Sequence, residues 1–145
     1  MRRYSNARVM AAMHSLFLVS CVAEVLVLGR SPPGAWCWAF LGLAVLTQGL
    51  RYWAIATLGE RWNTRVIVLP GAEPVTGGPY RFVKHPNYLA VIVELMALPL
   101  IHGAWLTALS FSLANAAVLA VRIRSEEAAL GPRWAQAFEN RSRFL

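Results

Sequence analysis

Apolar residues gather in four blocks along the chain, and short polar or turn-forming segments separate them. The blocks run over residues 9–28, 35–58, 88–101 and 104–121. A helix needs about 20 predominantly apolar residues to cross the hydrocarbon core of a bilayer. The first two blocks have that length. The last two are shorter and separated only by His102-Gly103, so they predict a tilted helical hairpin. The pattern therefore predicts an all-α membrane protein with about four transmembrane helices.

Two polar segments lie outside these blocks. Residues 59–87 form a long connection rich in proline and aromatic residues, with a short extended piece expected at residues 66–69. Long connections of this kind are usually functional or disordered, and the aromatic content argues against disorder. The tail from Arg122 to Leu145 is polar with a helical pattern that Gly131-Pro132 interrupts. We expect the connection and the tail to carry the chemistry of the protein.

The basic residues are distributed unevenly between the two predicted ends of the helices. With four spans, one side holds Arg2, Arg3, Arg8, Arg61, Arg65, Arg81, Lys84, Arg122, Arg124, Arg133, Arg141 and Arg143, whereas the opposite side holds only Arg30. The positive-inside rule then places both termini and the long connection in the cytoplasm. A lipoprotein-like box at residues 18–21 leaves an alternative with a cleaved first segment and three spans. The short, Arg- and Ala-rich chain favours a bacterial inner membrane.

Composition excludes some function classes. The chain is 57% hydrophobic and 14% charged, against about 25% charged in a typical soluble domain. The net charge of +7 does not indicate a nucleic-acid binder, because the arginines flank apolar blocks and membrane lipids with anionic headgroups are the expected counter-charge. Cys21 and Cys37 form no Cys-x-x-Cys or Cys/His cluster, so we expect neither a disulfide framework nor a metal site.

Two segments combine side chains suited to binding a polar ligand. Residues 78–88 and 122–130 each lie where a polar segment meets an apolar block, on the same predicted membrane face. Together they supply cations, an imidazole, aromatic rings and two carboxylates. A cofactor with an adenine, ribose hydroxyls, an ammonium and a carboxylate needs this mixture. The alternative is that these residues are ordinary interface anchors and a solvated helix face.

The spacing of these motifs resembles one membrane enzyme family. Gly-Pro-Tyr-Arg at residues 78–81, Lys-His-Pro-Asn-Tyr-Leu at 84–89 and Arg-x-x-x-Glu-Glu-x-x-Leu at 122–130 resemble the isoprenylcysteine carboxyl methyltransferase family and its phospholipid methyltransferase relatives. The resemblance covers residues 57–145, and in the tail it includes Trp134, Phe138 and Arg143-Phe144-Leu145. The chain departs from the family pattern at Ala72, where a histidine is usual, and at Lys84, where an arginine is usual.

We expect a single methyltransferase-like domain over residues 1–145, with two N-terminal spans in 1–58, of which the first fifty residues match the family only as apolar helices, and a catalytic core in 59–145. The resemblance implies S-adenosyl-L-methionine as methyl donor and a lipophilic small molecule as acceptor. The donor contacts it implies are Pro74, Val75, Tyr80, His85, Pro86, Asn87, Tyr88 and Glu126. Glu127 is a further candidate donor contact, because both glutamates can accept from hydroxyl or ammonium groups. The resemblance assigns Arg122, one helical turn before Glu126, to the acceptor. By its charge, Arg124 is a second candidate to attract an anionic acceptor.

Methyl transfer from a sulfonium is an in-line displacement that requires alignment of donor and acceptor and exclusion of water. A carboxylic acid acceptor needs no strong base, whereas a phenol or an amine needs one, and His85 and Glu94 are the candidates. A carboxylate inside a span costs about 2.5–3.5 kcal/mol on insertion scales. Glu94 is therefore either an acceptor-site group or half of a buried hydrogen-bonded pair, and Glu24 presents the same choice.

Two other functions fit parts of the pattern. Membrane sterol-type reductases that use NADPH carry a similar His-Pro-Asn-Tyr motif, but they usually follow it with a small residue and a glutamate, where this chain has Leu89-Ala90-Val91. A non-enzymatic membrane scaffold is the second alternative. The sequence leaves open the identity of the acceptor, the atom that is methylated and the oligomeric state.

Overall fold

The computed structural model describes residues 5–62 and 73–144, with side chains from Ala12 onward. The expected extended piece at 66–69, Ala72 and the basic residues Arg2, Arg3 and Arg65 lie outside these ranges. The elements are α1 (Ser5–Val27), α2 (Trp36–Leu58), η1 (Gly59–Arg61), η2 (Gly78–Arg81), α3 (Pro86–Ile101) and α4 (Trp105–Ala137). In the described ranges there is no strand, and an isolated parallel bridge joins Val83 to Ser142. The all-α prediction is confirmed.

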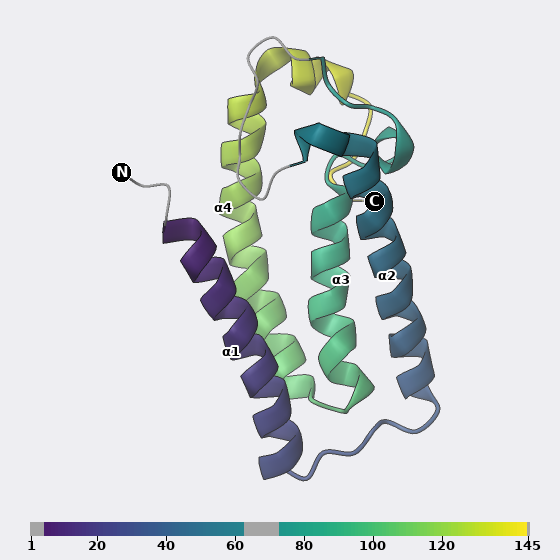
Figure 1. The fold of residues 1–145 in the computed structure, drawn as a ribbon, viewed down its shortest axis with the longest axis vertical. Helices are drawn as coiled ribbons and strands as arrows, with labels where there is room; N and C mark the ends of the chain where they lie inside the picture. Colours follow the sequence, from purple (N-terminus) through teal and green to yellow (C-terminus); the bar gives the residue numbers. More distant parts are fainter. Residues whose placement is uncertain (1–4, 63–72, 145) are drawn as a thin grey trace.

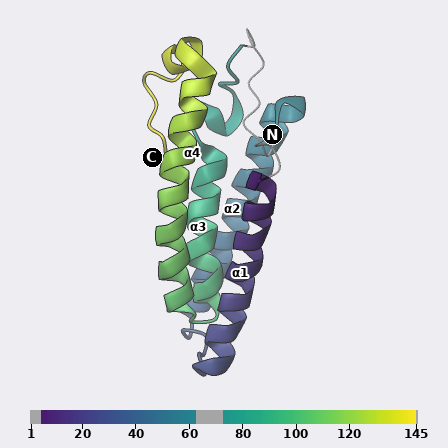
Figure 2. The same cartoon turned by 90° about the vertical axis from the view of Figure 1, so that its left-hand side faces the viewer.

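The helices run along the long axis of the molecule and alternate in direction. Figure 1 shows α3 between α2 and α4, with α1 packed on the outer side of α4, and Figure 2 shows the same arrangement from the side. We call the end that holds η1, η2 and residues 131–144 the site end. We call the other end, with residues 29–35 and 102–104, the turn end. Both chemistry-bearing segments of the sequence lie at the site end.

The α3–α4 pair forms the predicted helical hairpin. Its turn contains Gly103, which has φ +75°, a conformation that favours glycine. A Cβ atom at this position would lie 2.4 Å from the carbonyl oxygen of Ser31, because the α1–α2 connection passes directly against the turn. The helix α3 begins at Pro86 rather than at Tyr88, since proline suits the first turn of a helix, where its missing N–H leaves no bond unmade.

The surfaces of α2 and α4 are apolar but are not buried inside the protein. Each contains a stretch long and apolar enough to cross a membrane, and only 17% and 28% of these stretches is buried. A core helix of a soluble protein would be largely buried. Large side chains such as Trp38, Leu46, Leu113 and Val121 are more than half exposed. Their natural surrounding is hydrocarbon, so we describe the chain as a membrane protein.

The helix interfaces are built from small residues. Ala54 and Ala90 are fully buried, and Ala44, Ala97 and Ala108 are nearly so. Small side chains allow membrane helices to approach closely, which strengthens packing where no hydrophobic effect drives helix association. Because the interfaces between the helices are closely packed and apolar, they leave few places for a polar side chain. Each buried acid therefore needs a specific partner.

Glu24 of α1 lies against the beginning of α4. Its two carboxylate oxygens accept hydrogen bonds from the backbone N–H groups of Leu106 (3.1 Å) and Thr107 (2.7 Å), and Arg30 Nε lies 3.3 Å away. The first N–H groups of a helix have no partner within the helix and attract negative charge. Glu24 thus caps α4 from a neighbouring helix, and the buried-pair alternative holds for this residue. The Arg30 guanidinium also lies 5.1 Å from the centre of the Trp105 ring.

We expect Glu24→Ala to lower the thermal stability of the protein in detergent, because two buried N–H groups lose their acceptors. Each such loss costs about 1–3 kcal/mol. Glu24→Gln, which keeps one acceptor oxygen, should lie between the alanine variant and the wild type. Leu26→Ala is the matched control on the same helix, since Leu26 is 76% exposed. Equal unfolding midpoints for Glu24→Ala and Leu26→Ala would contradict the capping role.

Arg51 of α2 and Glu94 of α3 form an ion pair between the two helices. Arg51 Nε donates to Glu94 Oε1 at 3.3 Å and Arg51 Nη2 donates to Glu94 Oε2. The Arg51 side chain turns sideways to the carboxylate, where a two-point contact satisfies both charges. Of the two alternatives for Glu94, the structure supports the buried pair.

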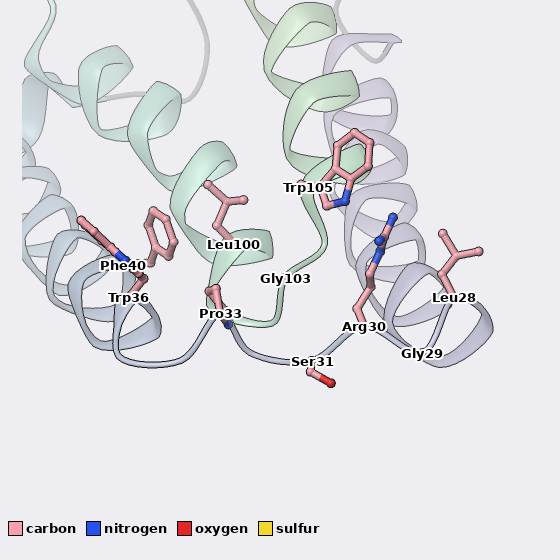
Figure 3. Close-up of a pocket in the computed structure, with 10 residues that line it drawn as sticks. All are labelled: Leu28, Gly29, Arg30, Ser31, Pro33, Trp36, Phe40, Leu100, Gly103 and Trp105. Carbon is pink, nitrogen blue, oxygen red and sulfur yellow. The ribbon is translucent and has the colours of Figure 1, made fainter.

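A cavity of about 510 Å³ lies at the turn end, between the α1–α2 connection and the hairpin. Figure 3 shows the residues that line it, among them Arg30, Phe40, Leu100 and Trp105. None of the chemistry-bearing residues of the sequence motifs is among them. This cavity is therefore not part of the candidate active site.

Candidate active site

The two sequence motifs meet at the site end, where the chain enters α3 and α4 passes beside it (Figure 1). Buried Pro79 anchors η2, and buried Pro86 begins α3 directly after His85. The helix α4 does not stop where its apolar part ends at Val121. It continues through the Glu126-Glu127 pair, and its φ/ψ angles leave the helical range only at Gly131. This continuous helix carries the second motif to the first.

Tyr88 links the two motifs through its hydroxyl group. Arg122 Nε donates to the Tyr88 oxygen at 2.8 Å, and the Tyr88 hydroxyl donates to Glu126 Oε2. Arg122 and Glu126 are one turn apart on α4, so both reach the same phenol of α3. The Arg122 guanidinium also lies 5.6 Å from the centre of the Tyr88 ring. A cation, a phenol and a carboxylate are thereby aligned along one face of α4.

His85 and Glu127 form a second contact between the motifs. His85 Nε2 lies 3.1 Å from Glu127 Oε1, and the imidazole is only 6% exposed. Arg143 from the tail donates to the same carboxylate through Nε (3.0 Å) and Nη2 (2.6 Å). Hydrogen bonding to Glu127 raises the pKa of Arg143 above its usual value, so the guanidinium is charged at every physiological pH.

Aromatic rings cover one side of His85. The ring centre of Trp134 lies 5.6 Å from that of His85, and Trp134 stacks on Phe138 at 4.8 Å. Phe138 is 1% exposed and anchors the last turn of α4. Lys84 Nζ lies 5.8 Å from the centre of the Trp134 ring. Of the aromatic residues in the tail, Trp134 therefore packs directly against the histidine, and Phe138 packs on Trp134.

Tyr80 of η2 lies near Glu126, and Asn87 precedes Tyr88 in the first turn of α3. Burial raises the pKa of Tyr80, and the nearby charge of Glu126 raises it further, so the phenol stays protonated. The Asn87 side-chain oxygen is buried, and in the described part of the chain it has no hydrogen-bond partner. Such an atom is rare in proteins, and a ligand N–H or O–H is one way to satisfy it.

Not every residue expected at the site joins this cluster. Glu94 lies six positions after Tyr88 on α3, which places it about 9 Å farther along the helix axis and about 240° around the helix. Its side chain faces α2, where it contacts Arg51. Its pairing with Arg51 favours a structural role over that of a base. Arg124 is exposed, on the side of α4 away from Arg122. Pro74 and Val75 are half-buried in the segment before η2, and no described hydrogen bond or ring contact joins them to the cluster.

Arg143 and Trp134 were not among the expected site residues. A signal was present, because both belong to the tail pattern of aromatic residues and a basic-apolar ending. Sequence spacing could not connect them to a site, since Arg143 is 16 positions from Glu127 and the chain between them turns back on itself after Phe138. Only the folded tail shows that they contact Glu127 and His85.

The cluster presents paired carboxylates, guanidinium groups, an imidazole and flat aromatic faces within one small region. Carboxylates accept from hydroxyl or ammonium groups, and aromatic faces receive flat rings or cations. No group of three or more His, Cys, Asp or Glu residues in the described ranges is suited to a metal ion. The arrangement is suited to an organic ligand that carries positive charge, hydroxyl groups and a planar ring.

Comparison with known proteins gives relatives in bacteria. The chain is 46% identical to the uncharacterized protein YpbQ of Bacillus subtilis (strain 168) over 81% of this chain and 70% of that protein. It is 36% identical to an uncharacterized protein of Haemophilus influenzae over 62% of this chain. It is 32% identical to the nickel-cobalt-cadmium resistance protein NccN of Alcaligenes xylosoxydans xylosoxydans over 76% of this chain.

The matched regions cover 54% of the length of the Haemophilus protein and 51% of NccN. No solved structure matches the chain. The sequence profile of the isoprenylcysteine carboxyl methyltransferase (ICMT) family matches residues 40–132, which include both motifs and most of α2, α3 and α4. Since this match covers more than half of the chain and contains every residue of the Arg122–Tyr88–Glu126 contact, the chain belongs to the ICMT family.

Proposed function

We propose that this protein transfers a methyl group from S-adenosyl-L-methionine to a lipophilic acceptor at one face of a membrane. The family suggests membrane methyltransferase activity. The observation that carries the proposal is the meeting of Arg122, Tyr88 and Glu126 beside the His85–Glu127 pair. In this proposal residues 59–145 form the catalytic core, and the first two helices complete the membrane domain.

The residues present fit the donor by their chemistry. The bound donor supplies a sulfonium methyl group that a nucleophile attacks in line. Glu126 and Glu127 would accept hydrogen bonds from its hydroxyl or ammonium groups, and Asn87 Oδ1 has an unmet capacity to accept one more. Tyr80 and Trp134 would offer aromatic surface for its planar base. The buried His85 would exclude water from one side of the cluster. Exclusion of water would favour transfer of the methyl group to the acceptor over its transfer to water.

The acceptor side of the proposal rests on Arg122. Its guanidinium lies where α4 leaves the apolar region, so it can hold an anionic head while an apolar tail stays in the bilayer. Arg124 would attract the acceptor from the surface. A carboxylate acceptor needs no base. For a phenol or an amine, His85 is the candidate base, and the Glu127 carboxylate beside it would stabilise the imidazolium that forms.

We also propose the orientation in the membrane. Of the described basic residues, Arg61, Arg81, Lys84 and Arg143 lie at the site end, whereas Arg30 lies at the turn end. The positive-inside rule then puts the site end in the cytoplasm, and the bacterial relatives of this chain support a location in the bacterial cytoplasmic membrane, which is the inner membrane where there are two. All four helices would span, with the short α3 accommodated by the hairpin geometry.

Binding of the donor tests the proposed function directly. Purified protein in detergent would be titrated with S-adenosylmethionine, S-adenosylhomocysteine and NADPH. We expect saturable binding of the first two and none of NADPH. Trp38→Ala, exposed on α2 near the turn end, is the control and should bind as the wild type does. Binding of NADPH alone would support the reductase alternative, and absence of donor binding would refute the methyltransferase proposal. Mass spectrometry of lipids after expression with a labelled methyl donor would identify the acceptor.

A further inference from the structure

We propose that Arg143, in the C-terminal tail, is a positioning residue that holds the donor side of the active site in its binding form. The inference rests on the proposed function, because it assigns to Arg143 a role in donor binding. It concerns the segment Arg141–Phe144, which we call the tail strap. The strap crosses the site end and contacts both motifs at once.

The first contact of the strap is a side-chain contact with α4. The Arg143 guanidinium bonds both oxygens of Glu127, through Nε at 3.0 Å and Nη2 at 2.6 Å. Such a two-point contact fixes the orientation of the carboxylate as well as its position. Glu127 Oε1 also contacts His85 Nε2 at 3.1 Å. Arg143 therefore determines which way Glu127 faces, and Glu127 in turn orients the imidazole.

The second contact of the strap is a main-chain contact with the entry to α3. The N–H of Lys84 donates to the Ser142 carbonyl at 3.0 Å, and the N–H of His85 donates to the Arg143 carbonyl at 3.2 Å. These two residues precede α3, so their N–H groups have no partner within the helix. The strap supplies the partners that hold His85 at the start of α3. This contact is made by backbone atoms and does not depend on which side chain stands at position 143.

The two contacts have separable consequences. A substitution of Arg143 removes the contact with Glu127 and keeps the backbone bonds that order the strap. The protein should therefore fold, because the Arg143 side chain is 53% exposed and the buried anchor of the tail is Phe138. The Arg122–Tyr88 contact does not involve the strap. Loss of the guanidinium should thus weaken the donor side and leave the acceptor side unchanged.

The experiment compares Arg143→Gln with Arg141→Gln, a variant in the same strap with the same change of charge. Arg141 packs on the Phe138 ring and donates to the Ala137 carbonyl, and neither contact reaches Glu127. We expect Arg143→Gln to raise the Kd for S-adenosylmethionine about tenfold or more, the effect of losing charged hydrogen bonds, and to leave the acceptor KM unchanged. Arg143→Lys should recover part of the affinity, because it keeps the charge without the fork. Arg141→Gln should bind as the wild type does.

A double-mutant cycle with Glu127→Gln tests whether Arg143 acts through Glu127. If it does, the double variant binds the donor no more weakly than Glu127→Gln alone. Additive losses, wild-type donor affinity in Arg143→Gln, or equal losses of donor and acceptor affinity would each overturn the inference. A wild-type protein that does not bind the donor would instead refute the proposed function, so the two failures are distinguishable.

Discussion

Arg51→Ala is expected to destabilise the protein by about 3–5 kcal/mol, because it leaves the Glu94 carboxyl group, 8% exposed, without its partner between α2 and α3. Truncation of one partner of a buried ion pair is more damaging than removal of both. Replacement of the pair by apolar residues is often neutral or stabilising. The double variant Arg51→Leu/Glu94→Leu should therefore regain most of the stability that Arg51→Ala loses.

Reversible unfolding in mixed micelles would measure both variants. Leu46→Ala, on the exposed face of α2, is the control for truncation of a side chain on that helix. A small loss in Arg51→Ala, similar to that of the control, would show that the ion pair contributes little. Methyl transfer by the double variant decides the remaining question about Glu94. If a stable double variant binds the donor but transfers no methyl group, Glu94 would again be a candidate acceptor-site residue.

Glu126→Ala is expected to weaken binding of S-adenosylmethionine by about ten- to a hundredfold, whereas Arg122→Ala mainly lowers turnover. A charged hydrogen bond to a ligand contributes about 1.5–3 kcal/mol, which corresponds to that range. Calorimetric titration would give the donor affinity, and transfer of a labelled methyl group would give the turnover. Arg133→Ala, which removes an exposed cation from the same helix, is the control. Equal donor affinity in the wild type and Glu126→Ala would refute this assignment.

Tyr88→Phe adds a measurement to that comparison. The Tyr88 hydroxyl accepts from Arg122 and donates to Glu126, so it couples the donor and acceptor sides of the site. We expect its removal to reduce both donor affinity and turnover, each by less than the corresponding substitution on α4. Arg122→Ala would then have no further effect on donor affinity in the Tyr88→Phe background.

Much of the fold could be predicted from local sequence. The boundaries of α1, α2 and α3 lie within a few residues of the apolar blocks, since glycine and proline mark the turns at Gly29–Gly34 and His102–Gly103. The predicted helical tail and its interruption at Gly131-Pro132 are confirmed. The sequence did not show that the tail continues the last apolar helix without a break at Arg122, so that both form α4. Backbone hydrogen bonds do not depend on side-chain polarity, so the helix continues to the break at Gly131, where φ is +76°.

The partners of the two buried acids, Glu24 and Glu94, could not be predicted from the sequence. The sequence indicated that Glu24 and Glu94 each needed a partner, because an isolated carboxylate is costly in an apolar surrounding. It did not indicate that Glu24 caps the start of α4 or that Glu94 pairs with Arg51. These partners come from other helices, and their choice depends on how each helix is rotated about its axis.

Composition and pattern alone therefore determined the membrane helices, the hairpin and the two motifs that identify the family, because each is a property of neighbouring residues. The tertiary structure decided which of those residues meet. It joined Tyr88 to Arg122 and Glu126, added Arg143 to the His85–Glu127 pair, and paired Glu94 with Arg51. The physical reason is that the preference of a helix for the bilayer depends on its own run of apolar residues. Hydrogen bonds between distant segments instead require one particular packing of α2, α3, α4 and the tail.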